Sequence, residues 1–404
     1  MRRVSSRAAW VGLALLAACT ADAPLSDLER GAAYVSDPAY RRAALERSLV
    51  APDNGYSALR LERYTEASWG ALPVWNPRAR PVLVSDLGGP VPNPGVDWEP
   101  LDLDVPWEEA ALSALGARAF SAYPAQVEPA LLMALTDADA PARFGLWVDG
   151  DRVGGLVWAE TPGGVQPAFS CASCHAIPRD DGPGLVLGAP NHAIDFGALL
   201  DASHSAHTSA GRWGPGRVDV TPDDVDNPTV IADLRAVRFQ RDLNRAATIS
   251  NDLMALTVRL ETAVITNSRE AVRPPRELAF ALAWYLWGLG DALPALPADG
   301  AGAAVFAREC GRCHLPPGLA GPPVALAAVA TDPTVGESPW RGTGAYQTTS
   351  LRGVARRGRL LAGGAIDSLE RLLDPDRVDG GHRYGQTLDD ADRASLLAVM
   401  RDLR

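Results

Sequence analysis

QPAFSCASCHAIPRDDGPG, residues 166–184, decides the fold expected of this 404-residue chain, because it contains Cys171, Cys174 and His175 in a Cys-x-x-Cys-His motif. Cysteines at this spacing can hold zinc, cycle as a redox dithiol or, with the following histidine, carry covalently attached haem. Zinc needs four ligands, usually two cysteine pairs within one compact module. A redox dithiol does not need the histidine. The histidine therefore favours haem.

A second motif supports this interpretation. Cys310, Cys313 and His314 repeat the pattern far downstream of the first motif, which does not suit a single zinc module. In haem attachment, two thiols add to the porphyrin vinyl groups, and the following histidine is held where its imidazole reaches the iron. The sequence therefore predicts two c-type haems as cofactors, one on each motif.

The N-terminus, MRRVSSRAAWVGLALLAACTADAP, has the basic, apolar and small-residue regions of an export signal. Its apolar run is too short to span a bilayer. Residues 16–19, Leu-Ala-Ala-Cys, resemble the lipobox of bacterial lipoproteins. That resemblance implies a signal peptide over 1–18, a lipidated Cys19 and a mature protein anchored to a membrane in the periplasm or cell envelope. An ordinary signal peptide with an incidental cysteine is the alternative.

Composition narrows the function classes further. The chain is 47% apolar and 22% charged, which predicts a globular protein of two or three domains. Its net charge is −11, and it has no basic stripe, so nucleic acid is excluded as a partner. With Cys19 assigned to lipid and two cysteines to each motif, none of the five cysteines is left for a disulfide or an iron–sulfur cluster.

An internal repeat predicts the domain organisation. Residues 233–250, DLRAVRFQRDLNRAATIS, align without gaps with residues 350–367, SLRGVARRGRLLAGGAID. Each copy follows one of the motifs and precedes an amphipathic helical pattern. The segment before the second motif resembles the first helix of class I cytochrome c domains.

We therefore predict a mainly α fold of two tandem cytochrome c-like haem domains, over residues 165–296 and 297–404. An irregular N-terminal region, residues 19–164, is expected to precede them. It should contain a β-hairpin near 143–160, where apolar residues alternate around Asp-Gly-Asp.

The ligand on the far side of each iron decides the function, because an iron with two protein ligands mainly passes electrons. An open position can instead bind peroxide or dioxygen. For the second haem we predict His382, in DGGHRYGQTL, just before the last helical pattern. For the first haem the alternatives are an open position, Met254, His192, His204 and His207.

Other residues near the motifs have less specific expected roles. Met400, on the apolar face of the last helical pattern, and Met133 are expected in the core. Trp213 could line the first haem pocket. Arg217 could pair with a haem propionate, because a guanidinium matches a carboxylate.

Several short stretches carry a family resemblance. They are WGPGRVD at 213–219, TSLRGV at 349–354 and GHRYG at 381–385, in order after the two motifs. With them the chain resembles the family of bacterial dihaem cytochrome c peroxidases, the methylamine-utilisation dihaem enzyme and, more loosely, rubber oxygenases. The resemblance implies periplasmic redox chemistry in which one haem relays electrons and the other reacts with peroxide or oxygen.

The chain departs from this family where polar groups would handle a bound peroxide. Ala362 and Gly363, in RLLAGGA, stand where the peroxidases typically have histidine and aspartate. The matching place in the first unit, DLNRAAT, lacks the family's aromatic-Asp-Gly. These departures favour a dihaem cytochrome that transfers electrons with a redox partner protein. The alternative is an oxidoreductase, a peroxidase or oxygenase that reacts at the first haem and uses the second as relay.

Overall fold

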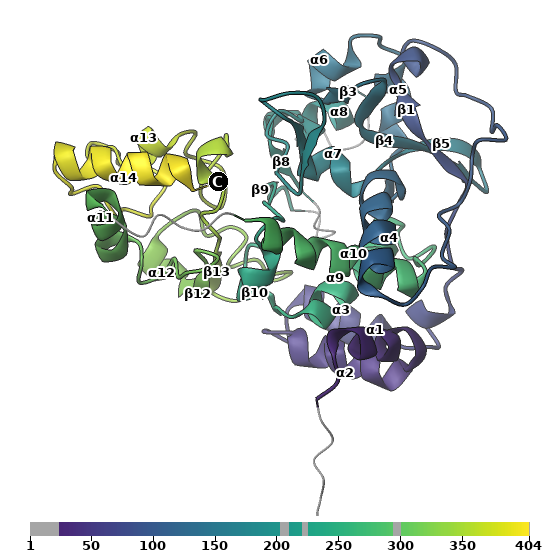
Figure 1. The fold of residues 1–404 in the computed structure, drawn as a ribbon, viewed down its shortest axis with the longest axis horizontal. Helices are drawn as coiled ribbons and strands as arrows, with labels where there is room; N and C mark the ends of the chain where they lie inside the picture. Colours follow the sequence, from purple (N-terminus) through teal and green to yellow (C-terminus); the bar gives the residue numbers. More distant parts are fainter. Residues whose placement is uncertain (1–23, 203–209, 220–224, 294–299, 404) are drawn as a thin grey trace, which may run out of the picture.

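The fold mixes helices with several small antiparallel sheets (Figure 1). The computed structural model describes residues 24–202, 210–219, 225–293 and 300–403. It is 40% helical and 15% strand, so the prediction of a mainly α fold is wrong. The predicted signal peptide, Cys19, His204, His207 and the boundary at 296/297 lie outside the described residues.

The N-terminal region, expected to be irregular, begins with helices. They are α1 (Asp27–Ser36), α2 (Pro38–Ser48) and α3 (Gly55–Arg63). Ser26, Asp37 and Asn54 cap them by accepting hydrogen bonds from backbone N–H groups of the first turn. These helices and α4 (Glu109–Ala122) share one core with α9 (Leu253–Asn267) and α10 (Arg276–Gly288).

A five-stranded antiparallel sheet follows and extends past residue 164, with strand order β1-β4-β5-β2 and β3 paired to β4. Its strands are β1 (Ala79–Leu83), β2 (Gln126–Val127), β3 (Val148–Asp149), β4 (Arg152–Thr161) and β5 (Gly164–Phe169). The expected hairpin is present, because Val148 pairs with Val153 across the Gly150–Asp151 turn. The sheet extends beyond that hairpin because β4 is buried along most of its length and needs partners on both edges.

Shorter elements occupy much of the chain between Ala130 and Ser250. The helices are α5 (Ala130–Leu135), α6 (Ala140–Phe144), α7 (Cys171–His175) and α8 (Phe196–Ala202). Three small hairpins pair β6 (Ala176–Pro178) with β7 (Leu185–Leu187), β8 (Arg217–Val218) with β9 (Thr229–Val230), and β10 (Asp242–Leu243) with β11 (Ile249–Ser250).

The C-terminal unit is the green and yellow lobe that ends the chain in Figure 1. Its helices are α11 (Ala301–Glu309), α12 (Leu326–Val329), α13 (Leu369–Leu372) and α14 (Asp390–Asp402), and its strands are β12 (Gly321–Ala325) and β13 (Ala345–Thr348). Helices α11 and α14 pack closely, because a Cβ added at Gly302 would lie 2.3 Å from the carbonyl oxygen of Ser395. No helix in the described ranges is long and apolar enough to cross a membrane.

The two copies of the internal repeat share their local backbone. Leu243 pairs with Ile249 in the first copy, and Leu360 forms the same antiparallel bridge with Ile366 in the second. The residue after each leucine is left-handed, with φ of 64° at Asn244 and 67° at Leu361. The sequence repeat therefore corresponds to a repeated tight turn.

Candidate functional site

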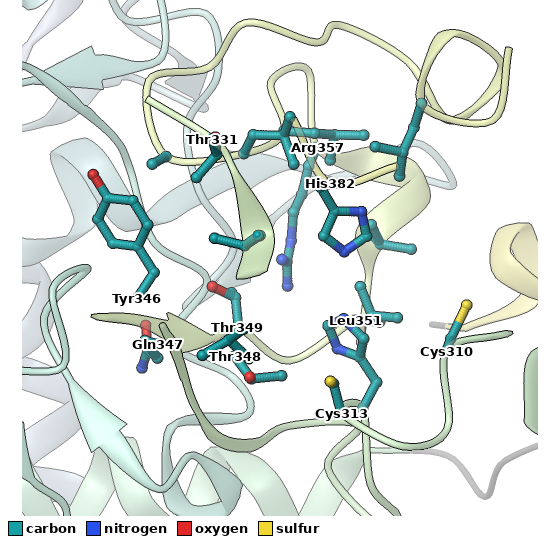
Figure 2. Close-up of a pocket in the computed structure, with 18 of the residues that line it drawn as sticks. Cys310, Cys313, Thr331, Tyr346, Gln347, Thr348, Thr349, Leu351, Arg357 and His382 are labelled. Atoms are coloured by element: carbon teal, nitrogen blue, oxygen red, sulfur yellow. The ribbon is translucent and has the colours of Figure 1, made fainter. Parts of the chain in front are cut away.

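The second Cys-x-x-Cys-His motif opens onto a cavity of about 160 Å³ (Figure 2). The cavity lies between the repeated units, since residues 230–233 and 245 line it together with residues of the C-terminal unit. Cys310, Cys313 and His314 lie on its wall. Much of the remaining wall is apolar: Leu351, Val354, Leu360, Leu361, Leu372, Leu373 and Met400. Met400 is buried, as expected.

His314 lies on the wall of this cavity with one ring nitrogen against a backbone carbonyl. Its Nδ1 lies 3.0 Å from the carbonyl oxygen of Leu319. With Nδ1–H donating to that carbonyl, Nε2 keeps its lone pair, which is the arrangement of most metal-ligating histidines. Burial lowers the pKa of His314 to about 4, so the imidazole is neutral at neutral pH and able to bind a metal.

His382 faces His314 across the cavity. Its backbone N–H donates to the carbonyl of Val329 (2.7 Å), and the Arg377 guanidinium donates to its carbonyl (3.0 Å). The Nδ1 atom is buried without a hydrogen-bond partner among the described residues. Figure 2 shows His382 and Arg357 entering the cavity from one side, with Cys313 on the other.

The spacing of these two rings suits one metal ion. The ring centroids of His314 and His382 are 6.4 Å apart. Metal–imidazole bonds of about 2 Å, with each ring centre about 1.1 Å behind its nitrogen, place two centroids about 6 Å apart. The site therefore fits the predicted second haem, with the two thiols beside one histidine.

Positive charge also surrounds the cavity. Arg245, Arg357 and Arg359 line it, and Asp233 is the buried acid beside them. Asp233 binds Arg235 at 2.6 Å and lies 3.8 Å from Arg357. Burial lowers the pKa of Arg245 to about 10, so it remains charged at neutral pH. The excess cations suit an anionic group, such as the carboxylates of a haem.

Arg245 and Arg357 were not among the candidates from sequence, because both lie within the repeat and no local motif marks them as binding residues. Arg217, the candidate named from sequence, instead donates to the carbonyl of Gly363 at 3.2 Å. The arginine content of DLNRAAT and ARRGR was the available signal.

The first motif forms α7, which is fixed against the large sheet. The hydroxyls of Ser170 and Ser173 both donate to the carbonyl of Gly155 in β4, at 2.6 and 3.0 Å. Gly155 has φ 61°, and a Cβ there would lie 2.6 Å from the backbone nitrogen of Ser173. Only glycine therefore allows β4 to approach the motif this closely.

His175 shares its hydrogen-bond pattern with His314. Its Nδ1 lies 2.9 Å from the carbonyl oxygen of Ala232, and burial lowers its pKa to about 4. Ala232 also lines the cavity of the second motif, so one residue connects the two sites.

The thiols of the first motif have the wrong pKa for a redox dithiol. Burial raises the pKa of Cys171 and of Cys174 to about 12, whereas dithiol oxidoreductases lower it. Within the described ranges, no three His, Cys, Asp or Glu side chains gather to hold a metal ion. A haem iron takes at most two such ligands, so haem binding does not require a group of three.

The described candidates for the far side of the first iron lie in different settings. Met254 is fully buried in the core of α9. Both ring nitrogens of His192 are buried and lack partners among the described residues. A Cβ added at Gly358 would lie 3.2 Å from the Cβ of His192. His192 therefore lies where the C-terminal unit contacts the rest of the chain.

Two further expectations can be compared with the structure. Trp213 is buried, stacks on Phe196 with centroids 6.4 Å apart and donates its indole N–H to Asp226. Met133, expected in the core, is 57% exposed, because it lies on the outer face of α5 while Leu131 and Leu135 face inward.

Comparisons with models of protein families, with curated proteins and with solved structures find no match for this chain.

Proposed function

We propose that this chain is a c-type cytochrome that binds two haems and transfers electrons. The observation that carries the proposal is the pair of facing imidazoles, His314 and His382, 6.4 Å apart in an apolar cavity with Cys310 and Cys313 on its wall. The repeated turn and the matching hydrogen bond of His175 support a second haem on the first motif.

Haem supplies reversible one-electron chemistry when bound. Cys310 and Cys313 would attach it at the second site, and His314 and His382 would hold its iron. An iron held by two protein ligands would mainly pass electrons, so such a site would suit electron relay. The Leu319 carbonyl orients His314, while Val329 and Arg377 hold the backbone of His382. The apolar part of the wall would keep water away from the bound group.

The cellular setting remains part of the proposal. The export signal and lipobox support a mature protein held in the cell envelope through lipidated Cys19. A protein so placed would exchange electrons with a redox partner protein.

Spectroscopy of the purified full-length protein tests the function. We expect a mass gain of two haems and optical and electron paramagnetic resonance spectra of low-spin iron only, unchanged by carbon monoxide after reduction. Absence of covalent haem would overturn the cytochrome proposal. One high-spin haem that takes up carbon monoxide would instead favour a peroxidase or oxygenase.

Matched cysteine variants assign each haem. Replacing Cys310 and Cys313 with alanine should remove one haem and the signal of the facing-histidine site. Replacing Cys171 and Cys174 should remove the other haem and leave that signal intact. Loss of both haems from a folded variant of either kind would contradict independent attachment.

A further inference from the structure

A second, smaller cavity lies away from both motifs. It measures about 80 Å³ and is formed by α3, α9 and the loop before β13. Arg60, Arg259 and Arg341 line it together with Tyr56 and Trp340, and no acidic side chain is among its described lining. For Arg60 and Arg259, a described lining without an acid is unusual, because buried charges are normally paired.

Among the described residues, Arg60 and Arg259 donate to neutral acceptors only. The Nε of Arg60 donates to the Thr262 hydroxyl at 3.2 Å, and its guanidinium lies 3.5 Å from the centroid of the Tyr56 ring. Arg60 is 3% exposed, and burial lowers its pKa to about 10, which leaves it charged at neutral pH. The Nε of Arg259 donates to the side-chain oxygen of Asn244 at 3.1 Å. Both guanidinium groups therefore retain uncompensated positive charge.

Neutral donors on the same wall also lack partners. The Tyr56 side chain is 2% exposed, and its hydroxyl has no hydrogen-bond partner among the described residues. The indole Nε1 of Trp340 is likewise buried and unpaired. Buried polar groups in folded proteins are rarely left unsatisfied. A hydroxyl, an indole N–H and guanidinium groups around one cavity together form a surface that accepts an anion.

We propose that this cavity binds a small tetrahedral oxyanion of the phosphate or sulfate class. Guanidinium groups bind such oxygens through parallel charged hydrogen bonds, and the tyrosine and indole donors can supply more. A buried water needs about 10–15 Å³ of cavity volume, so this cavity has room for a species larger than water.

The bound anion would join three distant segments of the chain. The backbone N–H groups of Gly55 and Tyr56 already donate to the carbonyls of Pro339 (3.0 Å) and Trp340 (2.8 Å). The Asn54 side chain donates to the carbonyl of Gly342 at 3.2 Å. These contacts hold the start of α3 against a loop of the C-terminal unit, and α9 supplies Arg259. The anion would neutralise the charge at this junction, independently of the haem sites.

An ionised Tyr56 is the competing source of negative charge. Burial raises the pKa of Tyr56, but Arg60, Arg259 and Arg341 lower it by more, so the net shift is downward. A phenolate would balance part of the cationic cluster without any ligand. The experiment must therefore separate phenolate from bound anion.

Isothermal titration calorimetry of the full-length protein with inorganic phosphate tests the proposal, at constant ionic strength and with sulfate and chloride as parallel titrants. We expect one phosphate or sulfate per chain and no comparable heat from chloride. Tyr56→Phe keeps the ring under Arg60 and should weaken binding about tenfold, as expected for one hydrogen bond to a charged group. Arg259→Gln should weaken it at least as much. Arg63→Gln, an exposed position on the same helix, should leave the affinity unchanged.

Three results would overturn the proposal. The first is that phosphate and sulfate release no more heat on titration than chloride does. The proposal also fails if folded Tyr56→Phe and Arg259→Gln variants both bind phosphate with the wild-type affinity. The third is tyrosinate absorbance at neutral pH that Tyr56→Phe removes, because the phenolate would then be the counter-charge. Haem spectra should be unchanged by phosphate, so this test fails or succeeds separately from the cytochrome proposal.

Discussion

Replacing His382 with glycine is the sharpest test of the facing-histidine site. His382 has φ 49°, in the left-handed region where glycine is favoured, so the substitution fits the existing backbone. Its backbone bonds to Val329 and Arg377 do not involve the imidazole and remain possible. The variant therefore removes the ring and little else.

The size of the effect follows from the geometry. Loss of the ring 6.4 Å from His314 leaves one side of one iron without a protein ligand. Half of the total haem should change from low-spin to high-spin, and the reduced variant should take up about one more carbon monoxide per chain than the wild type. Relief of the left-handed histidine is worth about 1 kcal/mol and offsets part of the cost of the new void.

Optical and electron paramagnetic resonance spectra measure the change, and added imidazole provides a rescue. Free imidazole should enter the vacated space and restore the low-spin signal. Ala330→Gly is the matched control, because Ala330 is exposed and has φ 50° but contributes no ring. A His382→Gly spectrum identical to that of the wild type would refute His382 as a ligand.

Two further predictions concern stability. Burial raises the pKa of Asp86, but its hydrogen bonds and the charge of Arg80 lower the pKa by more. The ionised Asp86 therefore stabilises the fold above pH about 4, and this contribution is lost as the pH falls through the lowered pKa. Asp86→Asn should cost about 2 kcal/mol in urea unfolding at pH 7 and much less at pH 3; an equal loss at both would contradict this. Gly116→Ala should destabilise the protein by about 3 kcal/mol in thermal unfolding, because the added Cβ would lie 2.1 Å from the carbonyl oxygen of Ala281. Gly288→Ala is the control, because a Cβ added there meets nothing within 4 Å, and it should be neutral or slightly stabilising. Equal melting temperatures for the two glycine variants would contradict the packing argument.

Local patterns predicted several features well. Gly150 and Asp151 between alternating apolar residues predicted a hairpin, and Val148 pairs with Val153 there. The two segments of the gap-free repeat form the same turn, with Leu243 opposite Ile249 and Leu360 opposite Ile366. These features depend on residues close together in the chain, where backbone preferences and side-chain alternation act directly.

The large sheet was not predictable in the same way. Ala79–Leu83 forms β1 only because it pairs with β4, with Ala79 opposite Ala159. The run after it is rich in proline and glycine and shows no strand periodicity. Strand pairing over such a distance depends on the tertiary fold, which is why a mainly α interpretation failed.

The sequence by itself determined the two Cys-x-x-Cys-His motifs, because covalent haem attachment would depend on fixed local spacing. It also offered His382 as a candidate, from its place just before the last helical pattern. Only the tertiary structure decided that His382 lies opposite His314 and that Arg245 reaches the same cavity from the other unit. It also decided that Arg60, Arg259 and Tyr56 surround one cavity. These groups come from distant segments, and only packing of the folded chain brings them within reach of a common ligand.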